Sequence, residues 1–186
     1  AAIIIWRKSN DQVALLLAVG LVTYGAYISP TIDALMVARP EFTLLANIVQ
    51  ASGLLTSMLF LYTFPNGRFV PFFTAYLFVI WMAWSLAWVI NPSLPINQSR
   101  PFDLPLTWFL VLMAWWATGV LAQFYRYGHV SNPVERQQTK FIVFGVLLVL
   151  LGYVLYLPTH YLLPPSSEQS FARILFNLTG VPLFLL

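Results

Sequence analysis

The sequence predicts an all-α protein, a polytopic bundle of transmembrane helices with about six spans. Three observations support this prediction. The chain is 60% hydrophobic and only 8% charged, whereas a soluble domain is about 25% charged. The charged residues lie at the edges of long apolar runs or between them, and never inside one. A proline-containing turn follows each run, and proline inside a helix removes a backbone hydrogen bond.

The lengths of the apolar runs predict five full spans within a single domain covering 1–186. A helix rises 1.5 Å per residue, so about 20 apolar residues cross a hydrocarbon core of about 30 Å. The predicted spans are 12–28, 43–64, 72–90, 106–125 and 141–157. Residues 1–6 and 172–186 are apolar but too short to cross. We expect a partial helix at 1–6 and a truncated one at 172–186, each belonging to a helix that continues beyond the chain.

Lysine and arginine are distributed unevenly over the connections between these spans. One side holds six cations, namely Arg7, Lys8, Arg68, Arg126, Arg136 and Lys140, and the other holds Arg39, Arg100 and Arg173. Cytoplasmic connections carry an excess of Lys and Arg. The sequence therefore predicts a multi-pass protein of the cell membrane, with Arg7/Lys8, Arg68 and Arg136/Lys140 in the cytoplasm.

The polar segment 131–140 has the pattern of a helix start. Asn132 suits the N-cap, Pro133 suits the first helical position, and Glu135 suits a capping box. The helix would then enter lipid at Phe141. Because the segment is polar and precedes a span, we also interpret it as a cytoplasmic coupling surface for a partner or an attached domain. This coupling surface comprises Asn132, Pro133, Glu135, Arg136, Gln137, Lys140 and Arg68.

Arg68 belongs to a second unusual turn, Pro65-Asn66-Gly67-Arg68, between two predicted spans. Glycine tolerates a positive φ, so this turn is strongly indicated. The arginine would lie at the level of the lipid headgroups. It could anchor the topology there, or it could contact a ligand or phosphate.

Several aromatic and polar residues lie inside the predicted spans. Trp81, Trp84 and Trp88 are spaced to share one helix face. Such an aromatic wall could hold a quinone, a carotenoid or another lipophilic ligand, or it could serve helix packing and lipid contact. Asn47 and Gln50 would bond to another helix or line a small polar pocket. The weak candidates for a lipophilic ligand site are Trp81, Trp84, Trp115, Trp116, Asn47 and Gln50.

Composition and spacing argue against several other functions. The chain has no cysteine, so thiolate metal sites and cysteine nucleophiles are excluded. His129 and His160 are predicted on opposite sides of the membrane, and both lysines are interfacial, which argues against haem and retinal. No catalytic constellation, phosphate loop or clustered basic face for nucleic acid is visible. We expect no cofactor, metal or enzyme activity in this chain, and a lipid bilayer, a homodimer or a larger membrane complex as partners.

Three stretches at comparable spacing carry a family resemblance: Trp6-Arg7-Lys8-Ser9-Asn10-Asp11, Phe64-Pro65-Asn66-Gly67-Arg68-Phe69-Val70-Pro71 and Val130-Ser131-Asn132-Pro133-Val134-Glu135-Arg136-Gln137-Gln138-Thr139-Lys140-Phe141. With them the chain resembles the N-terminal polytopic membrane region of a group of bacterial sensor histidine kinases. The resemblance implies a signal-input domain of the bacterial cytoplasmic membrane, acting on a cytoplasmic output region absent from this chain. Two alternatives stay open: a non-catalytic subunit of a photosynthetic or respiratory complex, and a transporter, which the uncharged spans disfavour.

Overall fold

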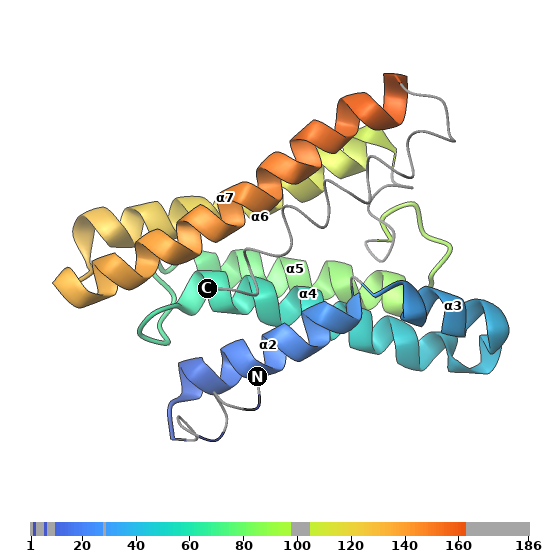
Figure 1. The fold of residues 1–186 in the computed structure, drawn as a ribbon, viewed down its shortest axis with the longest axis horizontal. Helices are drawn as coiled ribbons and strands as arrows, with labels where there is room; N and C mark the ends of the chain where they lie inside the picture. Colours follow the sequence, from blue (N-terminus) through green and yellow to red (C-terminus); the bar gives the residue numbers. More distant parts are fainter. Residues whose placement is uncertain (1, 3–5, 7–9, 28, 98–104, 163–186) are drawn as a thin grey trace. The chain divides into compact units, whose positions relative to one another are not determined.

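A computed structural model describes residues 2, 6, 10–27, 29–97 and 105–162 of the chain, all of its regular elements being helical (Figure 1). The elements are α2 (Gln12–Tyr27), α3 (Pro30–Ala38), the short 3-10 helix η1 (Pro40–Phe42), α4 (Thr43–Thr63), α5 (Thr74–Ile90), α6 (Leu106–His129) and α7 (Pro133–Leu162). The predicted all-α class is confirmed. The predicted runs at 12–28, 43–64 and 72–90 match α2, α4 and α5 to within two residues at each end, and those at 106–125 and 141–157 lie within α6 and α7.

The chain forms two compact units, Ala1–Arg126 and Tyr127–Leu186. The boundary falls inside α6, so residues 127–129 at the end of this helix belong to the second unit together with α7. We call these the first and second units.

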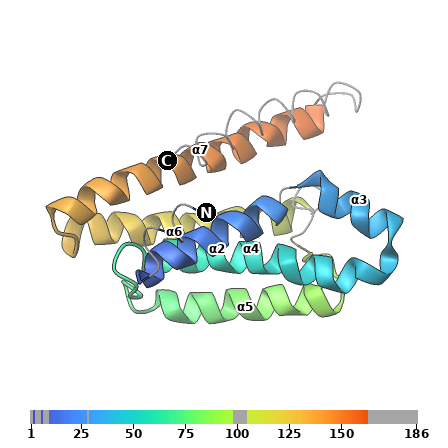
Figure 2. The ribbon, with the colours of Figure 1, turned by 60° about the horizontal axis from the view of Figure 1, so that its bottom comes forward.

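Helix α4 is the centre of the first unit and lies between α2 and α5 (Figure 2). At Gly53 its backbone touches that of α2, because a Cβ atom added there would lie 2.5 Å from the carbonyl oxygen of Thr23. The hydroxyl groups of Thr23 and Thr56 are 3.1 Å apart across the same interface. Only a residue without a side chain permits this approach, so Gly53 sets the spacing of the two helices.

Two helices within the described residues are long and apolar enough to cross a membrane, Pro40–Thr63 and Leu106–His129. A third crossing exists if α2 and α3, which are bent by 55° relative to each other, form one span. The structure is thus compatible with a membrane protein, but the expected six spans are not supported. Helix α5 has only 17 residues, and at 1.5 Å per residue it extends about 25 Å.

The remaining predicted spans fall partly or wholly outside what the structure describes. The run 141–157 lies within α7, but the side chains of residues 153 and 155–162 are not described. The truncated helix expected at 172–186 lies outside the described residues, as does most of the partial helix expected at 1–6.

Helix α3 is an element that the sequence reasoning missed. The proline-containing turn that follows the run 12–28 is Ser29-Pro30, and the sequence pattern predicted only that it ends the first span. In the structure Ser29 caps α3, its hydroxyl accepting a hydrogen bond from the backbone N–H of Thr31 at 3.3 Å, and Pro30 occupies the first helical position. Serine at the N-cap followed by proline favours a helix start. The same dipeptide that ends α2 therefore begins the next helix.

Candidate functional site

The turn from α6 to α7 is built as the sequence predicted. The side chain of Asn132 accepts a hydrogen bond from the backbone N–H of Glu135 at 2.9 Å, and the Glu135 carboxylate accepts one from the backbone N–H of Asn132 at 3.0 Å. This is a complete capping box. In addition, Nε of Arg136 donates to the carbonyl oxygen of Ser131 at 3.1 Å, which fixes the first turn of α7 against the loop before it.

Because the capping box is local, its contribution can be measured directly. Replacing Asn132 with alanine removes one acceptor from the helix start and should lower the free energy of unfolding by about 1 kcal/mol. Replacing Asn132 with aspartate, an equally good cap, should leave it unchanged. Denaturant titration in detergent distinguishes the two. Equal losses for both variants would contradict the capping role.

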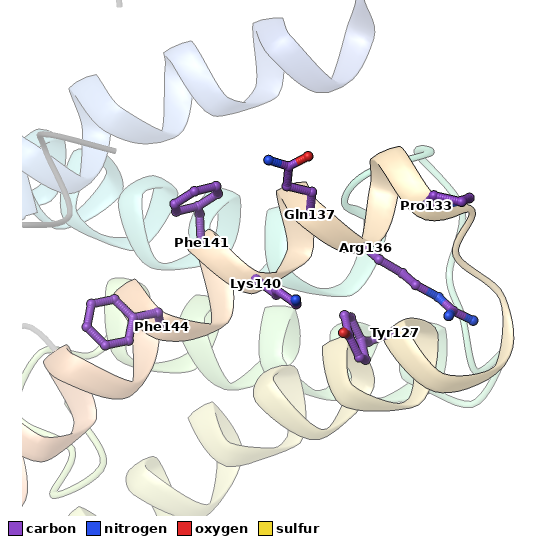
Figure 3. Close-up of a pocket in the computed structure, with 7 residues that line it drawn as sticks. All are labelled: Tyr127, Pro133, Arg136, Gln137, Lys140, Phe141 and Phe144. Atoms are coloured by element: carbon purple, nitrogen blue, oxygen red, sulfur yellow. The ribbon is translucent and has the colours of Figure 1, made fainter.

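A pocket of about 790 Å³ opens beside this turn, entirely within the second unit (Figure 3). Its lining residues are Tyr127, Pro133, Arg136, Gln137, Lys140, Phe141 and Phe144. Figure 3 shows Arg136 and Lys140 extending from α7 toward the ring of Tyr127 at the end of α6. The guanidinium carbon of Arg136 lies 5.7 Å from the centre of that ring, and Nζ of Lys140 lies 5.8 Å from it. We call this site the basic pocket.

The two cations of the basic pocket lie over the tyrosine ring, and neither pairs with a carboxylate in the described part of the chain. Cations within about 6 Å of an aromatic face are attracted to its negative potential. The one salt bridge among the described residues joins Arg39 and Glu41, far from the pocket in sequence. The nearest carboxylate along the chain, that of Glu135, accepts the hydrogen bond of the capping box. The pocket is therefore basic and has no internal counter-ion in the described part of the chain.

The structure divides the predicted coupling surface into three parts. Four of its residues line the basic pocket, namely Pro133, Arg136, Gln137 and Lys140. Asn132 and Glu135 form the capping box beside it. Arg68 belongs to the loop between α4 and α5 in the first unit, where its side chain is exposed. Sequence reasoning did not anticipate that Tyr127, Phe141 and Phe144 join the cations.

A second arrangement, at the end of α6, was missed by sequence reasoning. Arg126 is only 1% exposed, and its guanidinium group donates to the oxygen atoms that end α4 and shape the following loop. The acceptors are the carbonyl oxygens of Tyr62 (2.7 Å), Thr63 (3.2 Å), Phe64 (2.6 Å), Arg68 and Val70 (3.1 Å) and the side-chain oxygen of Asn66 (3.1 Å). We call this arrangement the Arg126 clamp.

The clamp satisfies backbone groups that the fold leaves open. The last carbonyl groups of a helix have no partner within it, and a cation near that end also favours the helix dipole. Gln123, one turn earlier on α6 and fully buried, adds hydrogen bonds to the carbonyl oxygens of Leu61 and of Phe64, the latter at 3.1 Å. In the sequence, this contact is indicated only by its donors, a glutamine and an arginine three residues apart near the end of an apolar run.

The loop held by the clamp has the predicted turn chemistry. Gly67 adopts a φ of +74°, a conformation open to glycine at little steric cost. Its backbone N–H donates to the carbonyl oxygen of Thr63 at 2.8 Å. Both proline peptide bonds of the loop, Phe64–Pro65 and Val70–Pro71, are cis. The prediction of a tight turn here is confirmed.

The candidate ligand residues inside the helices do not form one site. The rings of Trp81 and Trp115 stack at 5.5 Å, and Trp84 meets both edge-on at 5.6 and 6.0 Å. Trp116 instead contacts the ring of Tyr24 on α2 at 6.4 Å. The three tryptophans on α5 and α6 thus fill the space between these helices with one another. This arrangement corresponds to the packing alternative left open by the sequence.

Asn47 and Gln50 lie in a third place, where α4 meets α3. Gln50 is fully buried, and its Nε2 atom donates to the Asp33 carboxylate at 3.4 Å, as the expected bond to another helix requires. Within the part of the chain that the structure describes, Nδ2 of Asn47 and Oε1 of Gln50 are buried without a hydrogen-bond partner.

Comparison of the chain with protein-family models, with curated proteins and with solved structures finds no match. Among the described residues there is also no group of three or more His, Cys, Asp or Glu side chains that could hold a metal ion. The functional interpretation therefore rests on the basic pocket and the Arg126 clamp.

Proposed function

We propose that this chain is a membrane-embedded signal-input domain, which passes a change in the packing of its helices to an attached output region through the coupling surface at the start of α7. This surface, like the Arg68 loop, would face the cytoplasm. The observation that carries the proposal is the position of Arg126. It is the last residue of the first unit, and it holds α6 to the end of α4.

The proposed transmission follows the covalent path of α6. A change at the end of α4 or in the loop 64–73 moves the carbonyl oxygens that Arg126 contacts. Because α6 continues as one helix from Arg126 through Tyr127 to His129, the movement reaches the ring on which Arg136 and Lys140 rest. A change between two states of the first unit would thereby alter the basic pocket. Coupling between two separate sites requires such an element with two states.

A double-mutant cycle tests this coupling. Gly67→Ala strains the loop, because alanine rarely adopts the φ of +74° found there. The chain has no cysteine, so a single cysteine at the exposed Val134 can carry a spin label. We expect Gly67→Ala to change the mobility of this label in the presence of Arg126, and to have no effect when Arg126 is replaced by alanine.

The matched control is a label at Ile90, which is 79% exposed at the end of α5. Its spectrum should stay the same in every variant. An unchanged Val134 label in the Gly67→Ala variant, or an equal change without Arg126, would contradict transmission through the clamp. The coupling is measured as the effect of both substitutions together on the Val134 label minus the sum of their separate effects.

The class of the protein has a separate test. A signal-input domain acts on an output region, so the protein isolated from its own membrane should have an intact mass well above the 21.1 kDa of this chain. Peptide sequencing of the additional part should reveal a dimerisation helix and an ATP-binding domain. An intact mass of about 21 kDa would sink the proposal.

One observation favours a second function, that of a non-catalytic subunit in a photosynthetic or respiratory complex. The interlocked rings of Trp81, Trp84 and Trp115 form a stiff apolar block between α5 and α6. Such a block suits a protein that stabilises its neighbours. Stoichiometric co-purification with redox or pigment-binding subunits would support this alternative over the signal-input domain.

A further inference from the structure

We infer that the basic pocket binds the phosphate group of an anionic glycerophospholipid. The inference rests on the proposed function in one respect, namely that this end of α7 faces a leaflet containing anionic lipid. It names the ligand of the coupling surface, and so identifies membrane composition as one input that the surface detects.

Charge is the first argument. Arg136 and Lys140 bring two positive charges to one pocket, and neither has a carboxylate partner within the described residues. Two of the backbone N–H groups at the start of α7 are already engaged, that of Glu135 by the side chain of Asn132 and that of Arg136 by the carbonyl oxygen of Asn132. We therefore expect an anion in the pocket to be bound mainly by the side chains. Arg136 presents its Nη atoms, since its Nε is bonded to Ser131.

The apolar part of the pocket indicates a lipid as the source of the phosphate. Phe141 and Phe144, the next lining residues along α7, are 52% and 59% exposed. They begin the apolar run of α7, directly after Lys140. The cations could contact the phosphate of a lipid headgroup, while the exposed rings that follow them could contact its acyl chains. Basic residues beside a transmembrane helix attract anionic lipids. A volume of about 790 Å³ is ample for a phosphate and its glycerol.

An acidic protein segment is the competing occupant. It would use the same two cations, but it would gain little from Phe141 and Phe144 at the start of an apolar helix. Nucleic acid requires a wider basic face than two cations provide. We therefore assign the pocket to the lipid and treat the peptide as an outcome of the test.

The experiment measures lipid binding to the full chain in detergent by native mass spectrometry, titrating phosphatidylglycerol against a background of phosphatidylcholine. Each Lys or Arg near an anionic surface contributes about 1 kcal/mol, so Arg136→Gln and Lys140→Gln should each weaken phosphatidylglycerol binding about fivefold. Arg39→Gln removes the same charge outside the pocket and should change binding by less than about twofold.

Further variants guard against a trivial loss of structure. Arg136→Lys keeps the charge and should retain binding, whereas Arg136→Gln removes it. Among the described residues the Lys140 ammonium group has neither a salt bridge nor a hydrogen bond and lies over the Tyr127 ring, so Lys140→Gln tests the pocket with little effect on folding. Phe144→Ala should weaken phosphatidylglycerol binding without changing the charge.

Three results would overturn the inference. One is equal weakening by Arg39→Gln and by the pocket variants. Another is binding of inorganic phosphate as tight as that of phosphatidylglycerol, which would reduce the site to an anion site. The third is a pocket that binds an acidic peptide but no lipid. All of these readouts are independent of signalling. A failure here would leave the Arg126 coupling untouched, and a failure of that coupling would leave lipid binding intact.

Discussion

Replacing Arg126 with alanine is expected to destabilise the protein by about 3 kcal/mol, because several charge-assisted hydrogen bonds to the carbonyl groups at the end of α4 and in the following loop are lost together. The loss should appear as a lower midpoint in titration with dodecyl sulfate from a mild detergent. Lysine at this position should restore only part of the stability, because its ammonium group cannot reproduce the planar fork of five N–H donors in arginine.

Arg39 provides the matched control for the clamp. Its side chain is 68% exposed and forms a salt bridge of 3.5 Å with Glu41, and such surface pairs contribute about 1 kcal/mol or less. Arg39→Ala should therefore cost far less than Arg126→Ala. If the two substitutions had the same effect, the hydrogen bonds at Arg126 would not be stabilising the fold.

The second large effect is expected at Gly53. An added Cβ would lie 2.5 Å from the oxygen and 2.7 Å from the carbon of the Thr23 carbonyl group, and backbone atoms cannot turn aside as a flexible side chain can. Gly53→Ala should force α2 away from α4 and destabilise the protein by about 1–3 kcal/mol, with loss of the Thr23–Thr56 contact.

Gly25 on α2 is the control for this substitution. A Cβ there would meet no atom within 4 Å, so Gly25→Ala should be neutral or stabilise the helix by up to about 1 kcal/mol. Opposite signs for the two alanine variants in the same unfolding assay would show that the α2–α4 contact is the cause. A neutral Gly53→Ala would contradict the close approach of these helices.

Local signals in the sequence predicted more of this structure than distant ones did. The capping box at Asn132 and Glu135 and the turn at Gly67 are encoded within a few residues, and both are present. The positions of α2, α4, α5, α6 and α7 were predicted from the apolar runs and from the proline-containing turns that follow them. Helix α3 was missed because Ser29-Pro30 both ends one helix and begins another, and periodicity alone does not distinguish these roles.

The contacts between distant segments were less predictable. The Arg126 clamp joins α6 to carbonyl groups about sixty residues earlier in the chain, and backbone acceptors have no signature in a sequence. The predicted coupling surface included Arg136 and Lys140, but the pocket that they line was not predicted, and neither was the part of Tyr127 in it, because the place of its ring depends on how the turn after α6 folds. The span count differed for two reasons. Helix α5 is apolar but has only 17 residues, and other predicted spans lie partly or wholly outside the described residues.

The Arg126 clamp also has a consequence for which substitutions the protein can tolerate. The clamp uses five main-chain carbonyl oxygens and the side-chain oxygen of Asn66. It therefore depends mainly on the path of the chain from 62 to 70, and on the identity of the side chain at Asn66. The clamp itself should form with any side chain at position 68, because Arg68 contributes its carbonyl oxygen to it, provided that glycine and the flanking prolines keep the loop in shape. Position 126 should tolerate no exchange, because one side chain serves so many backbone partners.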